Sequence, residues 1–95
     1  PSAGVLGRAW PNPFRPSTII PFRLDEEADA RIDIWDVSGR RVRQLVGARM
    51  PAGDHQAVWD GRDDTGRKLS NGTYFYRMAI DGRRVPGAGK ALLIR

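Results

Sequence analysis

The chain has 95 residues, a formal net charge of +5 at neutral pH and no cysteine. This length predicts a single domain, and the lack of cysteine excludes disulfides, zinc–thiolate sites and a thiol nucleophile. No apolar run approaches the roughly 20 residues that span a bilayer, so we expect no membrane insertion. The positive charge is nearly all arginine and is interleaved with acidic residues. That pattern is typical of a solvated surface, and we expect no nucleic-acid partner.

The N-terminal stretch is small and flexible in composition. We expect residues 1–9 to be a linker remnant and residues 10–95 to form the domain. Because the chain begins with Pro1 and not with methionine, we interpret it as a fragment of a longer protein. Any secretion signal would then lie on the upstream sequence.

A proline-rich segment follows, from Trp10 to Pro16. Its prolines exclude a helix and forbid a central strand. We expect the segment to run extended along a sheet edge, with Trp10 and Phe14 packed on the core. The Asn-Pro-Phe triplet also matches a peptide-ligand motif, but a fixed edge segment is the favoured interpretation.

Alternating apolar and polar residues predict the first strands. Residues 17–24 alternate as a half-buried strand does, and Pro21 within them indicates an edge position or a bulge. Residues 28–37 alternate again until the phase breaks near their end, which predicts a bulge or a strand end buried on both sides. A tight turn at residues 36–39 leads into a returning strand at residues 41–46.

Three further strands are predicted at residues 55–59, 73–81 and 89–95. Tyr74 lies where a long connection enters a strand, which suits a tyrosine corner whose hydroxyl returns to nearby backbone. Turn signals recur about every 8–12 residues, and no amphipathic helical window is present. The predicted fold class is therefore all-β, an immunoglobulin-like antiparallel β-sandwich of about seven strands.

The long polar connection between two of these strands has an aromatic anchor at each mouth. Trp59 lies at its start and Tyr74 just after its end. Asp60 and Gly61 form turns readily, as does Gly72 with the asparagine before it. We expect these positions to organise the small core.

No residue pattern marks a reaction centre. His55 is the single histidine, and no serine or threonine is marked as its activated partner. Asp60, Asp63 and Asp64 could present oxygens to calcium, but their spacing departs from the usual calcium loop, and turn formation is the favoured role. We therefore predict a protein that is not an enzyme and that holds no cofactor and no metal.

Five sequence blocks, taken together, carry a family resemblance. They are PNPFRPST-x-I; IDIWDVSGRRVR-x-L; AG-x-H-x-x-x-WDGRD-x-x-G; LSNGTYFYRM; and GK-x-LL. Each block alone is weak. Their order and spacing resemble the FlgD immunoglobulin-like domain and its relative, the type A C-terminal sorting domain of type IX secretion cargo. The similarity spans residues 10–95, which is essentially the whole domain.

The resemblance implies one of two roles. Sorting domains are usually the last domain of large secreted proteins in Bacteroidetes and allied Gram-negative phyla. The implied partners are an outer-membrane translocon, its shuttle protein, a sortase-like protease that removes the domain, and the upstream domains of the parent protein. The implied location is secreted or cell-surface, after transit through the periplasm. In the flagellar relative, the domain belongs to the hook-capping scaffold.

The resemblance also assigns roles to positions. In the family the closing strand and its basic residues belong to the sorting signal, and the matching residues here are Lys90, Leu92, Leu93, Ile94 and Arg95. Arg95 stands where lysine is common, a mild change for a signal read by charge. The matches to the family's structural motifs are Pro11, Asn12, Pro13, Trp59, Asp60, Gly61, Gly72 and Tyr74.

A recognition mechanism follows as a hypothesis. If the last strand lies at a sheet edge with unpaired backbone groups, a receptor could capture it by strand addition and charge complementarity. One alternative is a structural module, of hook-cap type or a filament or stalk building block that self-associates through its edges. Another is an accessory carbohydrate-binding module that exposes aromatics among Trp35, Phe75 and Tyr76. A nucleic-acid surface at residues 40–43 is the least favoured.

Overall fold

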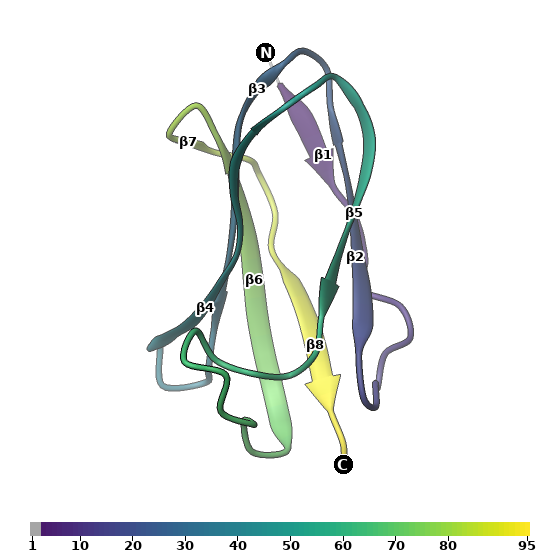
Figure 1. Ribbon diagram of the computed structural model, residues 1–95, viewed down its shortest axis with the longest axis vertical. Coiled ribbons are helices and arrows are strands. Elements are labelled where there is room, and N and C mark those ends of the chain that lie inside the picture. The colour runs from purple at the N-terminus through teal and green to yellow at the C-terminus, as the bar shows by residue number, and fades with distance from the viewer. Residues whose placement is uncertain (1–2) are drawn as a thin grey trace.

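The computed structural model describes residues 3–95, which fold into two antiparallel sheets packed face to face (Figure 1). The smaller sheet has the order β1-β2-β5, with β1 at Gly4–Leu6, β2 at Thr18–Leu24 and β5 at Gly53–Trp59. The predicted all-β, immunoglobulin-like sandwich is confirmed. No helix that is long and apolar enough to cross a membrane occurs within the described residues.

The larger sheet has five strands in the order β4-β3-β6, and β6 then bonds two shorter strands, one toward each of its ends. The strands are β3 (Ala28–Trp35), β4 (Arg41–Met50), β6 (Gly72–Ile80), β7 (Arg83–Arg84) and β8 (Gly89–Leu93). Residues 3–95 thus form eight strands, where the sequence predicts about seven and assigns residue ranges to six. The additional strands, β1 and β7, are too short to show an alternating pattern.

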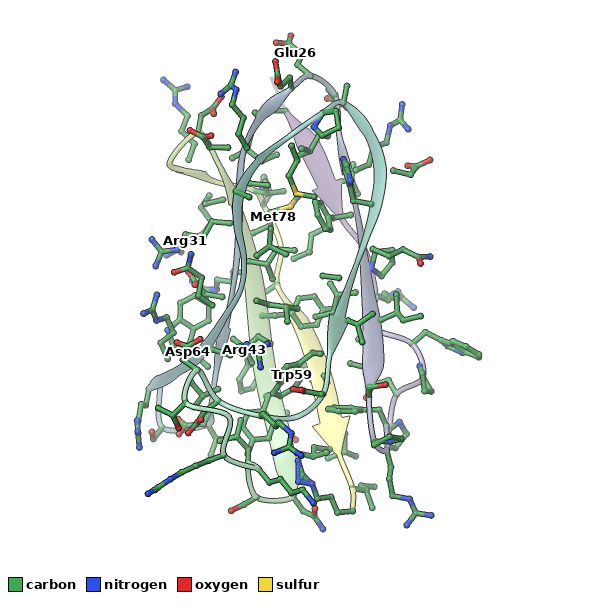
Figure 2. All side chains as sticks on the ribbon, in the orientation of Figure 1. Glu26, Arg31, Arg43, Trp59, Asp64 and Met78 are labelled. Atoms are coloured by element: carbon green, nitrogen blue, oxygen red, sulfur yellow. The ribbon has the colours of Figure 1, made fainter. Side chains whose placement is uncertain are left out.

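The core lies between the sheets and follows the alternation of β2 and β6. Their inward side chains are buried, as predicted: Thr18, Ile20, Phe22 and Leu24 from β2, and Tyr74, Tyr76, Met78 and Ile80 from β6. Figure 2 shows Trp59 and Met78 between the two sheets. The Trp59 ring is fully buried, and its centre lies 5.3 Å from those of Phe14 and Tyr74. These three aromatic rings fill one end of the core.

In the first 24 residues, the pairing of strands differs from expectation in two places. Gly4–Leu6, expected in a linker, pairs with β2, so the folded unit reaches back at least to Gly4; residues 1–2 lie outside the described residues. β2 is neither an edge strand nor bulged, because it pairs regularly with β1 and β5. Pro21 fits there because it lies just past the end of β1, where its carbonyl accepts a hydrogen bond from the Gly7 N–H (2.8 Å).

The predicted irregularity of the β3–β4 hairpin is present, but the extra residues belong to β4. The register shifts between Ile32 and Asp33 and again between Ile34 and Trp35. Each shift leaves one residue of β4 without a partner on β3. The pairing of β3 with β6 is regular, so Asp33 and Trp35 remain on the outer face of the larger sheet.

Candidate partner-recognition surface

β8 and the proline-rich segment before β2 lie side by side. The Asn12 carboxamide bonds β8 twice: Nδ2 donates to the Lys90 carbonyl and Oδ1 accepts from the Leu92 N–H, both at 2.8 Å. A neighbouring strand would supply such a donor and acceptor through its backbone. Pro11 and Pro13, which flank Asn12 and are exposed, have no N–H to donate. One side chain therefore takes the place of a strand residue.

Phe14 continues the pairing along β8. Its N–H donates to the Leu92 carbonyl (2.9 Å) and its carbonyl accepts from the Ile94 N–H (3.2 Å). Its ring is buried against Trp59, as predicted. Together with the Asn12 bonds, these contacts engage the outer edge of the backbone from Lys90 in β8 to Ile94, just past its end. The expectation of an unpaired edge is therefore wrong for this stretch.

The residues expected to form the sorting signal have different environments. Leu93 is fully buried and Leu92 is half-buried, so both contribute to packing. Ile94 is 45% exposed. Lys90 is exposed, and its ammonium group has no hydrogen bond or ion pair with any described residue. A partner could therefore reach Lys90 and Ile94, but not Leu93.

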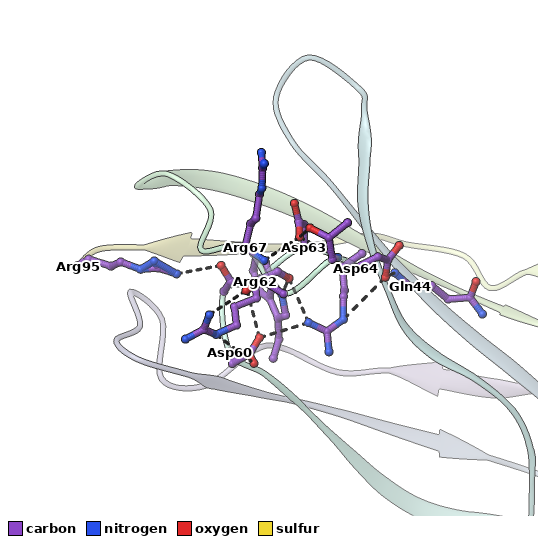
Figure 3. Close-up of polar contacts among 12 residues, drawn as sticks. Gln44, Asp60, Arg62, Asp63, Asp64, Arg67 and Arg95 are labelled. Carbon is purple, nitrogen blue, oxygen red and sulfur yellow. Dashed lines mark hydrogen bonds and ion pairs between the residues drawn. The ribbon is translucent and has the colours of Figure 1, made fainter.

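Arg95 lies beyond β8 and is bound to the β5–β6 loop, residues 60–71. Its guanidinium donates to the carbonyls of Gly61 (2.9 Å) and Leu69 (3.2 Å), and its N–H donates to Oδ1 of Asn71 (2.9 Å). Figure 3 shows Arg95 reaching this loop. The guanidinium that was expected to address a receptor is thus engaged inside the domain.

Gly61 leaves room for the Arg95 contact. Its φ of +72° lies in the left-handed region that favours glycine. A Cβ at this position would lie 2.8 Å from Nη2 of Arg95 and 3.2 Å from the Leu93 side chain. Trp59 anchors the same corner, because its Nε1 donates to the Arg62 carbonyl (3.0 Å). The Trp-Asp-Gly block therefore joins the core to the C-terminal end of β8.

Asp63 closes a turn within the β5–β6 loop. Its Oδ1 accepts from the Thr65 hydroxyl (2.7 Å), the Thr65 N–H (2.9 Å) and the Arg67 N–H (3.0 Å). The Thr65 hydroxyl is the main cause that lowers the pKa of Asp63. Asp36 in the β3–β4 turn accepts from Ser38 in the same way, and its pKa is also lowered. Both turns are predicted by their sequences.

Asp60 and Asp64 share an arginine partner, and Asp64 also bonds the edge of β4 (Figure 3). Nη1 of Arg43 lies 3.3 Å from Oδ1 of Asp60, and Nε of Arg43 lies 3.9 Å from Oδ1 of Asp64. Asp64 also bonds the edge of β4, since its Oδ1 accepts from the Gln44 N–H (2.9 Å) and its N–H donates to the Val42 carbonyl (3.0 Å). Among residues 3–95 no three His, Cys, Asp or Glu side chains form a group suited to a metal ion. The β5–β6 loop instead covers one end of β4.

Tyr74 makes the predicted corner at the start of β6. Its hydroxyl donates to the Ser70 carbonyl at 2.7 Å, which confirms the tyrosine corner. Gly72 begins β6 immediately after the β5–β6 loop. Burial is the main cause that raises the pKa of Tyr74. Gly72 and Tyr74 therefore shape the entry to β6.

A hollow of about 520 Å³ opens beside the start of β8. Tyr76 fixes its wall, because the hydroxyl donates to the Gly7 carbonyl (2.9 Å) and accepts from the Ala9 N–H (2.8 Å). Trp10 is 75% exposed, so the expectation that it packs on the core is wrong. Three exposed residues that line this hollow are here called the β8 surface: Trp10, Asn12 and Lys90.

Of the residues considered for other activities, His55 and Tyr76 are engaged within the domain. Nε2 of His55 donates to the Pro51 carbonyl (2.8 Å), and its ring stacks on Phe22 at 5.2 Å. Tyr76 is buried, so it cannot contribute to an exposed aromatic row. Trp35 and Phe75 are half-buried on the outer face of the larger sheet.

Sequence reasoning missed that Asn12 and Phe14 occupy the edge of β8. A local signal was present, because an asparagine between two prolines has a carboxamide but no neighbouring backbone donors. The partner carbonyl of Lys90 lies 78 residues later in the chain. Nothing in the local sequence identifies that partner.

Comparison with known proteins agrees with this architecture. A sequence model of the FlgD Ig-like domain matches residues 13–83. Dimeric latent PorU from Porphyromonas gingivalis superposes with a TM-score of 0.78 at 24% identity, over 96% of this chain and 9% of PorU. FlgD from P. aeruginosa superposes with a TM-score of 0.64 at 21% identity, over 96% of this chain and 72% of that FlgD chain. A third structure is FlgD from Xanthomonas campestris, described for hook capping in flagellar assembly. It superposes with a TM-score of 0.62 at 25% identity, over 97% of this chain and 62% of that FlgD chain. No curated protein matches by sequence.

These findings define a small immunoglobulin-like module. In each of the three solved structures the matching region is one part of a longer chain, and this chain spans only 9% of PorU. The chain belongs to the FlgD Ig-like domain family. The matched range ends at residue 83, before β8, so the strand expected to carry the sorting signal lies outside it.

Proposed function

We propose that this domain is a non-catalytic sorting and anchoring domain of a larger secreted bacterial protein. The type IX secretion machinery would recognise it through the β8 surface. The observation that carries the proposal is that Lys90 of β8 is unpaired and lies beside the exposed Trp10. Asn12 fixes the position of β8 through two hydrogen bonds. Membership in the FlgD Ig-like family and the ordered sequence blocks, including the terminal GK-x-LL, support it. The parent protein would then be secreted or bound to the surface of a Gram-negative bacterium.

The paired edge of β8 favours recognition of the folded surface over strand addition. A receptor that adds a strand would first have to displace Asn12 and the buried Phe14. A receptor that reads the surface meets the Lys90 ammonium group and the Trp10 indole without any rearrangement. Exposed charge steers association, and an aromatic side chain provides contact area. We therefore expect the translocon or its shuttle protein to contact side chains rather than the β8 backbone.

The role of the domain in this proposal is to be recognised, and it includes no reaction centre. The upstream domains of the parent protein would supply any activity. A sortase-like protease would act where the domain joins them. The engaged His55 favours this division of labour, since its Nε2 and ring face Pro51 and Phe22 and not a serine or threonine.

The test is export of a fluorescent reporter fused in front of this chain, in a bacterium with a type IX system. The chain offers a matched pair of variants, because Lys90 and Lys68 are its two lysines and both are exposed. We expect Lys90→Glu to reduce export at least about tenfold and Lys68→Glu to leave it unchanged. Thermal melting of the purified variants checks that both fold. Equal export of the two variants, or no export of the unchanged fusion, would refute the proposal.

A structural module of the hook-cap type is the second candidate. It is favoured by the family match and by the likeness to FlgD of Xanthomonas campestris. Asn12 covers the edge of β8 and Asp64 covers part of the edge of β4. This disfavours self-association by strand addition at those two places. The test replaces the Ig-like domain of FlgD in a flagellated bacterium with this chain. Restored swimming together with failed reporter export would favour the hook-cap role.

A further inference from the structure

The outer face of the larger sheet holds a groove of about 640 Å³. Figure 2 shows Arg31 pointing outward from this sheet. The groove exists because small residues flank Arg31, with Gly47 of β4 and Ala79 of β6 directly opposite it. We call it the outer groove. Its lining includes Arg31, Asp33, Trp35, Gln44, Arg77 and Arg84.

Two arginines of the outer groove are unpaired. Arg77 on β6 and Arg84 on β7 have no side-chain hydrogen bond or ion pair with any residue in the described range 3–95. Arg31 and Arg41, by contrast, both pair with Asp33, at 2.7 and 3.5 Å. A guanidinium binds a carboxylate through two parallel hydrogen bonds. The free pair therefore favours an anionic ligand.

Asp33 adds a second requirement, for a hydrogen-bond donor. The residue is 7% exposed, and its Oδ1 accepts no hydrogen bond from residues 3–95, although it forms an ion pair with Nη1 of Arg41 at 3.5 Å. A buried acceptor without a donor is unfavourable. Since Asp33 lines the groove, a ligand that carries hydroxyl groups could satisfy this oxygen.

An apolar platform lies at one end of the outer groove. Trp35 and Phe75 face each other across β3 and β6 and are half-buried. They line a second hollow of about 360 Å³, and Arg77 and Arg84 line both hollows. The free positive charge thus lies directly beside two aromatic rings.

We propose that the outer groove binds an acidic polysaccharide built from carboxylated sugar rings. Its carboxylates pair with Arg77 and Arg84, a ring hydroxyl donates to Asp33, and the C–H face of a ring stacks on Trp35. DNA fits less well, because it carries a negative phosphate at every nucleotide and no hydroxyl donor along its backbone, and would meet Asp33. An extended acidic peptide would bind along a sheet edge rather than across a sheet face. This site goes beyond sorting, because neither arginine belongs to the β8 surface.

The test is native affinity electrophoresis of the domain in gels that contain polygalacturonate, neutral dextran or single-stranded DNA. We expect retardation by polygalacturonate alone, and binding at least about tenfold weaker for the double variant Arg77→Gln/Arg84→Gln. The control Arg15→Gln/Arg67→Gln removes the same charge from exposed arginines outside the groove and should bind like the unchanged domain.

Equal weakening in both double variants would mean that net charge alone attracts the polymer, and would overturn the proposal. Equal retardation by DNA, or no retardation by polygalacturonate, would overturn it too. Trp35→Phe and Trp35→Leu then test the platform, since phenylalanine keeps an aromatic face and leucine does not. We expect the leucine variant to bind more weakly than the phenylalanine variant, with both still folded by thermal melting.

Discussion

β8 is held by two segments that differ in kind. Along its outer edge, Asn12 and Phe14 bond its backbone, and the Phe14 ring is 2% exposed against Trp59. Beyond its end, Arg95 bonds two carbonyls of the β5–β6 loop from an exposed position. The first contact combines hydrogen bonds with a buried ring, whereas the second is polar, with one exposed and one partly buried hydrogen bond.

This difference indicates which segment sets stability and which sets orientation. Burial of apolar surface contributes about 25 cal/mol per Å² and is not screened by salt. Exposed charge-assisted hydrogen bonds contribute about 1 kcal/mol or less, because water competes for the same groups. We therefore expect the Asn12–Phe14 side to keep β8 in the sheet, and Arg95 to direct the end of the chain.

The strongest way to break the comparison is Phe14→Ala. We expect it to lower the free energy of unfolding by about 3–5 kcal/mol, because it empties a ring-sized volume beside Trp59. Trp10→Ala is the matched control in the same segment, and its exposed ring should cost less than about 0.5 kcal/mol. Urea unfolding followed by circular dichroism measures both. Similar losses for the two variants would mean that burial is not what holds the segment.

Gly61→Ala tests the contact between Arg95 and the β5–β6 loop by changing the loop backbone. Alanine at a left-handed φ costs about 1–2 kcal/mol, and here the added Cβ also meets Arg95 and Leu93. Gly66→Ala is the control, because Gly66 has a φ of +89° and an added Cβ there has nothing within 4 Å. We expect Gly61→Ala to be the more destabilising in thermal and urea unfolding. Equal effects would show that the Arg95 contact imposes no constraint on the loop.

Asn12→Ala removes the side-chain pairing but leaves Phe14 in place. We expect a loss of about 1–2 kcal/mol, since two hydrogen bonds to β8 disappear. The sharper measurement is hydrogen exchange of the Leu92 N–H, which should become faster. Asn71→Ala removes the bond to the Arg95 N–H instead and should leave Leu92 protected. Unchanged exchange at Leu92 in Asn12→Ala would contradict the pairing.

The sequence predicts faces and turns better than it predicts edges. The alternation of β6 identifies Tyr74 and Met78 as core because burial on one face of a strand has a period of two residues. The edge of β8 is different, since Asn12 and Lys90 are far apart in the chain and each looks like an exposed polar residue. Arg95 looked free because its acceptors are backbone carbonyls, which have no sequence pattern. Long-range polar contacts of this kind need the fold.

Arg95→Gln should have a smaller effect than any of these changes. Glutamine keeps a donor but loses the charge and the reach to two carbonyls, so we expect a loss below about 1 kcal/mol that shrinks in high salt. Arg67→Gln is the control, with an exposed side chain in the same loop. Thermal melting at low and high salt measures both. A loss as large as that of Asn12→Ala would reverse the ranking of the two segments.

The smallest expected effect on stability is that of Thr65→Val, in the β5–β6 loop that Arg95 contacts. The Thr65 hydroxyl is the main cause that holds the pKa of Asp63 below its usual 3.8. Stability from this contact is present above that pH and is lost as the pH falls through the folded-state pKa of Asp63. Thr65→Val should therefore raise the pKa of Asp63, measured by NMR titration, and leave the pKa of Asp36 unchanged. The stability difference between the variant and the unchanged domain should be full at neutral pH and vanish in acid. A difference that is constant with pH would mean that the hydroxyl does not act through the Asp63 carboxylate.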